Sequence, residues 1–388
     1  MRNNVLSQLE SDYPQSLLTI FIIVEEKDRK TVEAAKQIGS EFKDVHIIIV
    51  PPNGENDWSE VIEKWSQHKN VEFDGDFNLP FGKGRALTYA YYSKYSTVRE
   101  SEVITIFDAE DIVNKNLFKY AISGLEQGYD IVQGILRYRN GGNNLLSALE
   151  SAEPVLWSNS IYPHTSNPSV PYQVLGPAYF FCSNLPEKIG GWNPYTTSED
   201  VDFGFKAWSN GRRLGILDIY TDELGVLTLK SWFKQRRRWA RGHQKALLSR
   251  YLKGKNGIET MSNIFYFYTY SMNSQLMSVT SIFGVPTGIY MIIQALLGFY
   301  ESSNLFVTII VLFNLVHWIY ASYLLVKDTR NAYKFSNMKE MVKFFLRVNP
   351  ISSLFYSMLW FVPVFAAIKD CLSETPIVWE KTPREGEA

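Results

Sequence analysis

Residues 103–111 read VITIFDAED, an apolar run that ends in a cluster of carboxylates. An apolar run of this length, bounded by polar residues, predicts a strand buried on both faces. Ligands of open α/β sheets bind beyond the carboxyl ends of the strands, where Asp108, Glu110 and Asp111 are expected to lie. Carboxylates in such a place can hold a hard divalent cation beside a diphosphate. The alternative is a solvated acidic turn that caps the next helix.

Strand-like and helix-like segments alternate on both sides of this stretch, through residues 1–255. Strands are predicted at 17–24, 45–50, 103–107 and 131–136, and helices at 28–42, 86–95, 117–127 and 201–210. This alternation predicts an α/β domain with a parallel sheet.

The composition excludes several classes of protein. The chain has 388 residues with 39 Lys+Arg and 40 Asp+Glu, a net charge of −1. A dedicated nucleic-acid binder is usually basic, so we expect no nucleic-acid partner. With 46% hydrophobic and 20% charged residues the chain is not disordered throughout. Two cysteines cannot form a disulfide framework.

The last third of the chain predicts membrane attachment. Residues 260–300, 304–326 and 348–368 contain no Asp, Glu, Lys or Arg, and about 20 apolar residues suffice to cross a bilayer. We expect an interfacial helix at 256–277, crossings at 278–300 and 304–326, a third crossing or re-entrant segment at 348–368, and a tail at 369–388.

The side on which each part lies follows from charge. The loop 327–347 is rich in Lys and Arg, which predicts a cytoplasmic position. Residues 1–12 are polar and lack the apolar region of a signal peptide. We therefore expect domain 1–255 in the cytosol, on a multi-pass protein of the cell membrane.

Further motifs carry candidate chemistry. Ser198-Glu199-Asp200 precedes a predicted helix and offers Asp200 as a general base, or simply caps that helix. The stretch 235–239, QRRRW, offers Arg238 to a diphosphate and Trp239 to a sugar, or lies on anionic lipid as a basic amphipathic helix. Residues 83–87, KGRAL, place two cations and a glycine before a helix, a weak phosphate-binding signal.

In this order, DAED, SED and QRRRW followed by apolar helices resemble the processive branch of glycosyltransferase family 2, which includes the cellulose and hyaluronan synthases. The family's DxD, TED and QxxRW motifs match these stretches, with Glu110 for the second Asp and Ser198 for Thr. Residues 24–31 (VEEKDRKT), 82–87 (GKGRAL) and the tail WEKTPR also resemble bacterial and archaeal members.

The resemblance implies a GT-A fold, a nucleotide-sugar donor, Mg²⁺ or Mn²⁺, and inverting transfer. Asp108 and Glu110 would hold the metal, with Asp111 as an alternative ligand. Asp200, with Glu199 beside it, would act as the base. The expected donor contacts are Glu25 or Glu26 at the base and Lys83, Arg85, Asp108, Gln235 and Arg238 near the phosphates. Trp239 and Trp192 are expected to contact the acceptor.

The resemblance also leaves alternatives open. The family has a first strand before the helix at 5–10, and this sequence begins at that helix, so we expect a GT-A sheet without its first strand. UDP-sugars are favoured, although GDP-mannose also fits. The acceptor is a growing polysaccharide or a lipid, and two or three crossings raise a homo-oligomer as an alternative to a single-chain polymer channel. A truncated, inactive membrane fragment is the third reading.

Overall fold

The computed structural model of the chain describes residues 1–54, 56–69, 71, 73, 75, 78–162, 172–250, 273–297 and 305–373. The strands are β1 (Ile20–Glu25), β2 (Val45–Val50), β3 (Val103–Ile106), β4 (Ile131–Tyr138), β5 (Tyr179–Cys182) and β6 (Leu214–Glu223). The helices before β6 are α1 (Arg2–Leu9), α2 (Arg29–Glu41), α3 (Asn56–Ser66), α4 (Lys83–Tyr92), α5 (Leu117–Glu126), α6 (Leu145–Leu156), α7 (Leu185–Ile189) and α8 (Glu199–Ser209). The helices after it are α9 (Leu229–Arg250), α11 (Asn273–Leu296), α12 (Leu305–Ala332), α13 (Met338–Arg347), α14 (Pro350–Leu359) and α15 (Phe361–Leu372).

The described strands form two sheets rather than one parallel sheet. Strands β1 and β2 pair in parallel, and the second sheet has the order β3-β5-β4-β6. Within it β4 and β6 are parallel, whereas β5 runs antiparallel to both β3 and β4. The prediction of a purely parallel sheet is therefore wrong. The short strand β5 is apolar like the strands beside it. No local pattern in the sequence fixes the direction in which it inserts between them.

Local sequence explains most element boundaries. Strand β2 coincides with the predicted strand at 45–50, and β1 begins at Ile20 because a 3₁₀ turn occupies Gln15–Leu17. Helix α2 begins after Asp28, whose carboxylate accepts a hydrogen bond from the Thr31 amide at 3.2 Å. Three acidic residues occupy the first turn of α8, where they complement the helix dipole.

Helix α1 connects the two sheets. Val5 is buried with the apolar residues of β1 and β2. On its other side, the Asn4 side chain donates to the Asp111 carbonyl at 3.1 Å, and the Ser7 hydroxyl accepts from the Val113 amide at 3.0 Å. Among the described residues α1 precedes the first strand, and β1–β2 remains a sheet of its own.

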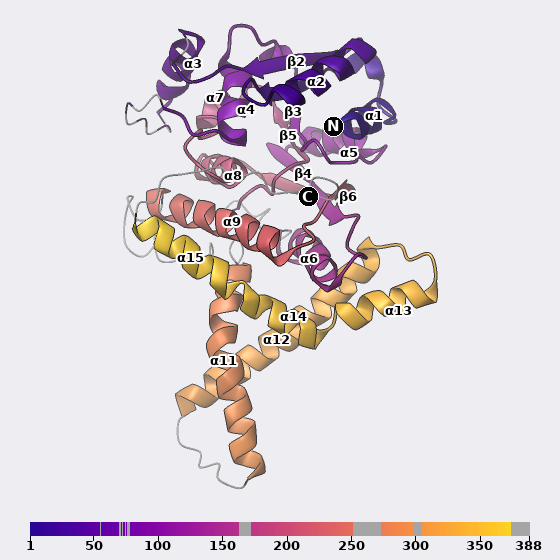
Figure 1. Cartoon of the computed structure of the whole chain (residues 1–388), viewed down its shortest axis with the longest axis vertical. Coiled ribbons are helices and arrows are strands. Elements are labelled where there is room, and N and C mark those ends of the chain that lie inside the picture. The colour runs from indigo at the N-terminus through magenta and orange to yellow at the C-terminus, as the bar shows by residue number, and fades with distance from the viewer. Residues whose placement is uncertain are drawn as a thin grey trace.

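The C-terminal helices lie against one side of this α/β domain (Figure 1). Helix α15 runs along α9, and the end of α12 packs on α6. Among the described residues one helix, Pro350–Leu372, is long and apolar enough to cross a membrane. Helices α11 and α12 occupy most of the first two predicted crossings. Residues 256–272 of the predicted interfacial helix and 374–388 of the tail lie outside the described residues.

Candidate active site

Lys83 and Asp108 join two of the predicted motifs. Lys83 begins α4, and its Nζ lies 2.5 Å from the Asp108 Oδ1 at the end of β3. Burial alone would lower the pKa of Lys83, but the negative charges of Asp108 and Glu199 outweigh it and raise the pKa. The helix can approach this closely because residue 84 is glycine: a Cβ there would lie 2.7 Å from the Asn193 carbonyl oxygen.

Glu199 and Asp200 lie in the first turn of α8, and the negative charge of Glu199 acts on Lys83. Backbone amides hold both oxygens of Asp200: Gly176 donates to Oδ2 at 2.6 Å and Val201 to Oδ1 at 2.9 Å. Asp200 is half-buried, whereas Glu199 is buried. Burial and the neighbouring Asp200 charge raise the pKa of Glu199 to about 7, against the opposing effect of Lys83.

Helix α9 brings the QRRRW motif to the same place. The Arg238 guanidinium donates to the Thr197 carbonyl at 3.1 Å, and the Thr197 hydroxyl donates to the Arg238 carbonyl at 3.3 Å. The positive charge of Arg238 also acts on Glu199. The structure thus gathers parts of KGRAL, DAED, SED and QRRRW around the end of β3, as sheet topology predicts for a ligand site.

A second cluster of candidate residues forms around Glu25 and Arg85. The Arg85 guanidinium is fully buried; it pairs with the Glu25 Oε2 and donates to the Pro51 carbonyl at 2.5 Å. It also lies over the rings of Trp58 and Phe81, at 4.5 and 4.8 Å from their centroids. Burial raises the pKa of Glu25, and Arg85 opposes this effect.

This arrangement separates two of the candidates. Arg85 has no exposed surface in this structure, and its guanidinium contacts Glu25, so its predicted contact with the donor stays a prediction. Glu26 is exposed in the turn after β1. Of these two acidic candidates, Glu25 is therefore the one that contacts Arg85.

The remaining acidic residues of DAED differ from one another. Glu110 is half-buried. Asp111 is 0% exposed, and its Oδ2 accepts from the Asp108 amide at 2.6 Å. Burial and the charges of Glu223 and Asp108 raise the pKa of Asp111 well above its usual range. Asp111 therefore shapes the turn and is not accessible as an alternative metal ligand in this structure.

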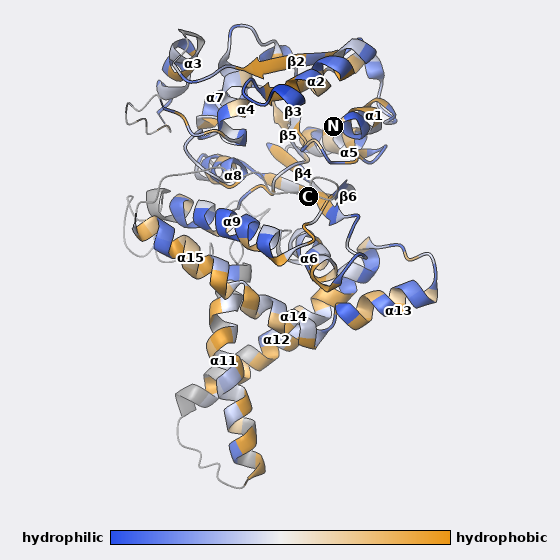
Figure 2. Cartoon of the chain, in the orientation of Figure 1, coloured by the Kyte–Doolittle hydropathy of each residue, from blue (hydrophilic) through white to orange (hydrophobic). Residues whose placement is uncertain are grey.

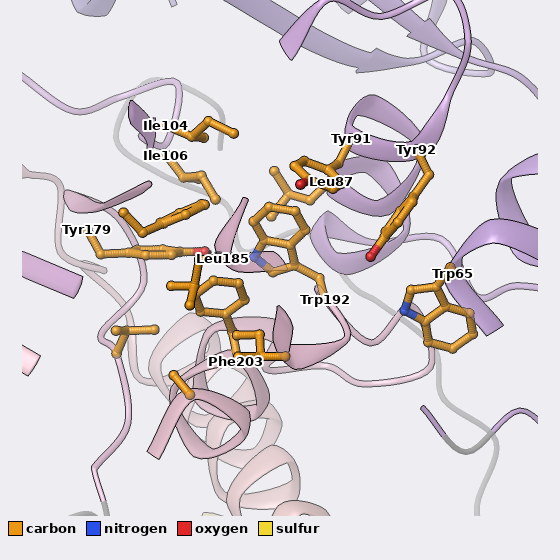
Figure 3. Close-up of a cluster of buried hydrophobic side chains, with 14 of the residues drawn as sticks. Trp65, Leu87, Tyr91, Tyr92, Ile104, Ile106, Tyr179, Leu185, Trp192 and Phe203 are labelled. Carbon is orange, nitrogen blue, oxygen red and sulfur yellow. Dashed lines mark hydrogen bonds between the residues drawn. The ribbon is translucent and has the colours of Figure 1, made fainter. Parts of the chain in front are cut away.

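Trp192 belongs to a core cluster of buried hydrophobic side chains, together with Tyr179 and Phe203 (Figure 3). It is 2% exposed, stacks on Phe203 with ring centroids 5.2 Å apart, and donates through Nε1 to the Tyr179 hydroxyl at 2.9 Å. The ring has no free face for an acceptor sugar, which corrects the predicted contact. Sequence alone gave Trp192 no partner, whereas the fold supplies Tyr179 and Phe203.

Within QRRRW, Gln235 and Arg236 are buried and the three residues that follow are half-buried, a difference that the motif does not reveal. Gln235 is 1% exposed and accepts from Arg236, so it offers no surface to a donor in this structure. Trp239 is half-buried, and the Arg236 guanidinium lies 4.2 Å from its ring centroid. The predicted contact between Trp239 and an acceptor sugar therefore stays a prediction.

Arg236 is the residue that the sequence reading missed. It is 0% exposed, between Glu150 Oε1 at 3.1 Å and Glu153 Oε2 at 2.6 Å. The rings of Trp232 and Trp360 also lie near its guanidinium. The sequence did contain a signal for a buried cation, because Glu150 and Glu153 share one face of a predominantly apolar helix.

The chain is similar to known glycosyltransferases over most of its length. It is 21% identical to the probable glycosyltransferase YdaM of Bacillus subtilis (strain 168) over 398 aligned residues, which cover 99% of this chain and 83% of that protein. Among solved structures it resembles the mannosyltransferase PcManGT of Pyrobaculum calidifontis, determined in complex with GDP-Man and Mn²⁺. The TM-score is 0.52 at 13% identity, covering 96% of this chain and 83% of that one.

The structural likeness shows a shared GT-A-like fold, which agrees with the predicted fold class in its mixed-sheet form. The family model for glycosyl transferase family group 2 matches residues 103–326, more than half of the chain, and its range includes DAED, SED and QRRRW. The chain therefore belongs to glycosyl transferase family group 2.

Proposed function

We propose that this glycosyltransferase moves a sugar, with inversion, from a UDP-sugar to a glycan or lipid acceptor at the cytoplasmic face of the cell membrane. The observation that carries the proposal is the position of Asp200. It is a half-buried carboxylate with both oxygens fixed by backbone amides, and it lies next to Glu199, which interacts with Lys83 and Arg238. This places a candidate base next to candidate cations for a phosphate, which supports the proposal.

In the proposed reaction Asp200 takes the proton of an acceptor hydroxyl. The hydroxyl oxygen forms a bond to the anomeric carbon while the bond between that carbon and the phosphate oxygen breaks. The electron pair of the broken bond leaves with the nucleoside diphosphate. Asp200 suits this role better than Glu199, because Glu199 is buried.

The negative charge that develops on the leaving diphosphate needs cationic partners. Lys83 lies at the first turn of α4, where helix amides and the dipole also favour an anion. The positive charge of Arg238 also acts on Glu199. Preorganised cations of this kind act where charge increases during the reaction.

The acidic residues fit a divalent cation that shares its coordination with the donor. Among the described residues no group of three His, Cys, Asp or Glu side chains could hold a metal ion. Mg²⁺ is commonly bound by one or two carboxylates together with substrate phosphates and water, and Asp108 and Glu110 supply two. The ion would neutralise diphosphate charge. That PcManGT was determined with Mn²⁺ supports the same class of metal.

The preference for uridine is supported by Glu25. Its Oε2 pairs with Arg85, and its Oε1 is buried without a hydrogen-bond partner among the described residues. A buried acceptor needs a donor, and the uracil ring has one imide N–H. Guanine presents two adjacent N–H donors, which would need both oxygens of a carboxylate. One oxygen of Glu25 is already paired with Arg85. PcManGT was determined with GDP-Man, so both nucleotides belong in the test.

The test measures nucleoside diphosphate release by the full chain in nanodiscs, across UDP- and GDP-sugars with Mg²⁺ or Mn²⁺. We expect release with a UDP-sugar and its loss in Asp200→Asn. Asp44→Asn makes the same change at an exposed carboxylate before β2 and should keep full activity. Substantial activity in a folded Asp200→Asn variant would falsify the assignment of the base.

Chromatography of the labelled product then separates the two acceptors. A ladder of lengths indicates a polysaccharide, and a single lipid-soluble product indicates transfer to a lipid. Release from no donor, with no binding of any nucleotide, supports the reading of an inactive chain.

A further inference from the structure

One glutamine is buried inside the sheet of the catalytic domain. Gln133 is the third residue of β4 and is 1% exposed. Strands β4 and β5 are mainly hydrophobic around it (Figure 2), and it pairs with Tyr179 of β5 on one side and Ile216 of β6 on the other. A buried side-chain amide is costly unless its donors and its acceptor find partners. The partners of Gln133 therefore indicate its role.

The Gln133 amide binds the backbone on both sides of Gly176. Its Oε1 accepts a hydrogen bond from the Leu175 amide at 3.0 Å. Its Nε2 donates to the Leu175 carbonyl and, at 3.1 Å, to the Pro177 carbonyl. The opposite orientation of this amide would place its oxygen against two carbonyl oxygens, so the contacts select one arrangement of the side chain.

The segment that Gln133 holds has an uncommon backbone conformation. Gly176 and Ala178 have φ angles of +44° and +61°, in the left-handed region that a side chain disfavours. Among the described residues Ala178 is the only one besides glycines with a positive φ. The ring of Pro177 fixes the φ angle between them. Such a conformation persists where surrounding contacts determine it, and the three hydrogen bonds from Gln133 are contacts of this kind.

Gly176 connects this segment to the candidate base. Its amide donates to the Asp200 Oδ2 at 2.6 Å, between residues that are 24 positions apart in sequence. The other amide that binds Asp200 belongs to Val201, the next residue of α8. Of these two hydrogen bonds, the one from Gly176 is therefore the one that fixes the carboxylate relative to the sheet.

We infer that Gln133 is a positioning residue for Asp200: by holding the backbone on both sides of Gly176, it sets the direction in which the carboxylate faces an acceptor hydroxyl. The inference rests on the proposed role of Asp200 as the base, and Gln133 lies outside all of the sequence motifs. A base must lie within hydrogen-bond reach of the proton that it takes, and a displacement of about 1 Å can cost about 100-fold in rate. The effect of Gln133 is therefore expected on the chemical step and not on donor binding.

A purely structural role is the alternative, because removal of a buried hydrogen-bonded amide destabilises a fold wherever it lies. The chain offers a matched control for this effect. Asn140, just after β4, is 6% exposed, and its side chain binds both the carbonyl and the amide of Gly225 at 2.8 Å. It also holds the backbone of a distant segment, but that segment contains none of the candidate site residues. Comparison of Gln133→Met with Asn140→Leu therefore separates positioning from stability.

The first test measures transfer by the full chain in nanodiscs, at a temperature at which each variant is folded. For Gln133→Met we expect kcat to fall about 10- to 100-fold, with a calorimetric donor affinity within about twofold of wild type. Asn140→Leu should keep the wild-type kcat. An unchanged kcat in Gln133→Met, equal falls in both variants, or a loss confined to donor affinity overturns the inference.

A second variant covers the case in which Gln133→Met does not fold. Gln133→Glu keeps the length of the side chain and can still accept from the Leu175 amide, but it cannot donate to the Leu175 and Pro177 carbonyls as a carboxylate. We expect kcat to fall in the same way in this variant, again without loss of donor affinity. Wild-type kcat in folded Gln133→Glu overturns the inference.

A double-mutant cycle asks whether Gln133 acts through Asp200. The base is absent in Asp200→Asn, so adding Gln133→Met should change the residual rate by less than about twofold. A further fall as large as that in the wild-type background shows that the two residues act independently and overturns the inference. An Asp200→Asn variant as active as wild type is a different result, because it contradicts the proposed base and not the contact made by Gln133.

Hydrogen exchange tests the contact without any activity. Peptides that cover residues 172–182 should exchange faster in Gln133→Met than in wild type, because the Leu175 amide loses its acceptor and the segment is released. The same peptides should exchange at the wild-type rate in Asn140→Leu. Equal protection in all three proteins shows that Gln133 does not hold the segment, and this overturns the inference even for a chain that releases no diphosphate.

Discussion

The backbone of Gly242 in α9 passes directly over the side chain of Ser198 before α8. A Cβ at residue 242 would lie 2.1 Å from the Ser198 Oγ and 2.4 Å from its Cβ. The absence of a side chain at Gly242 therefore allows the QRRRW helix and the SED motif to meet. Side chains of any size would push α9 away from Asp200.

Substituting Gly242 by alanine should separate these motifs. We expect Gly242→Ala to lower transfer strongly and to destabilise the fold by about 1–3 kcal/mol through overpacking. Thermal unfolding and diphosphate release measure the two effects. The double variant Gly242→Ala/Ser198→Gly removes the colliding atoms and should recover both. Equal loss in the single and double variants would contradict the contact as the cause.

The raised pKa of Glu199 makes stability depend on pH. Because the pKa is about 7 in the folded state and the unfolded value is 4.5, the folded state binds more protons between these values. Stability should therefore fall as pH rises from roughly 4.5 to 7. Glu199→Gln cannot ionise, so its stability relative to wild type should increase over this range. Parallel unfolding curves for both proteins at pH 5 and pH 8 would contradict this prediction.

Arg236 and Arg237 are adjacent but should respond very differently to replacement. Arg236→Met leaves Glu150 and Glu153 as buried charges without their cation, which typically costs about 3–5 kcal/mol. The Arg237 side chain is 43% exposed, although its partner Asp370 is largely buried, so Arg237→Met should cost less, about 1–3 kcal/mol. Denaturant unfolding compares the two. Adding Glu153→Gln to Arg236→Met should recover part of the loss.

Lys83 is expected to contribute to donor binding more than to the fold. Lys83→Met removes the cation next to Asp108, and a hydrogen bond to a charged group contributes roughly 1.5–3 kcal/mol. Donor affinity should therefore fall about 10- to 100-fold in calorimetric titrations with Mn²⁺. Lys94→Met alters an exposed lysine near the end of the same helix and should bind normally. Unchanged affinity in Lys83→Met would remove this residue from the site.

Much of the catalytic domain could be predicted from local sequence. Strand β2 and helices α2 and α5 lie where apolar periodicity and capping residues place them, because these signals act between residues close in the chain. The motifs DAED and SED also fall at a strand end and a helix start, as expected. Family membership follows from the same stretches, which lie within the range matched by the family model.

Tertiary structure decided which of these residues are accessible. Arg85, Gln235 and Trp192 carry the residue types of ligand contacts, yet each is buried in the folded chain. The direction of β5 and the packing of Pro350–Leu372 on α9 also depend on contacts between segments that are distant in sequence. Sequence determined the local elements and the chemical groups of the site, whereas burial depends on which surfaces meet in the folded chain, and only the fold specifies that.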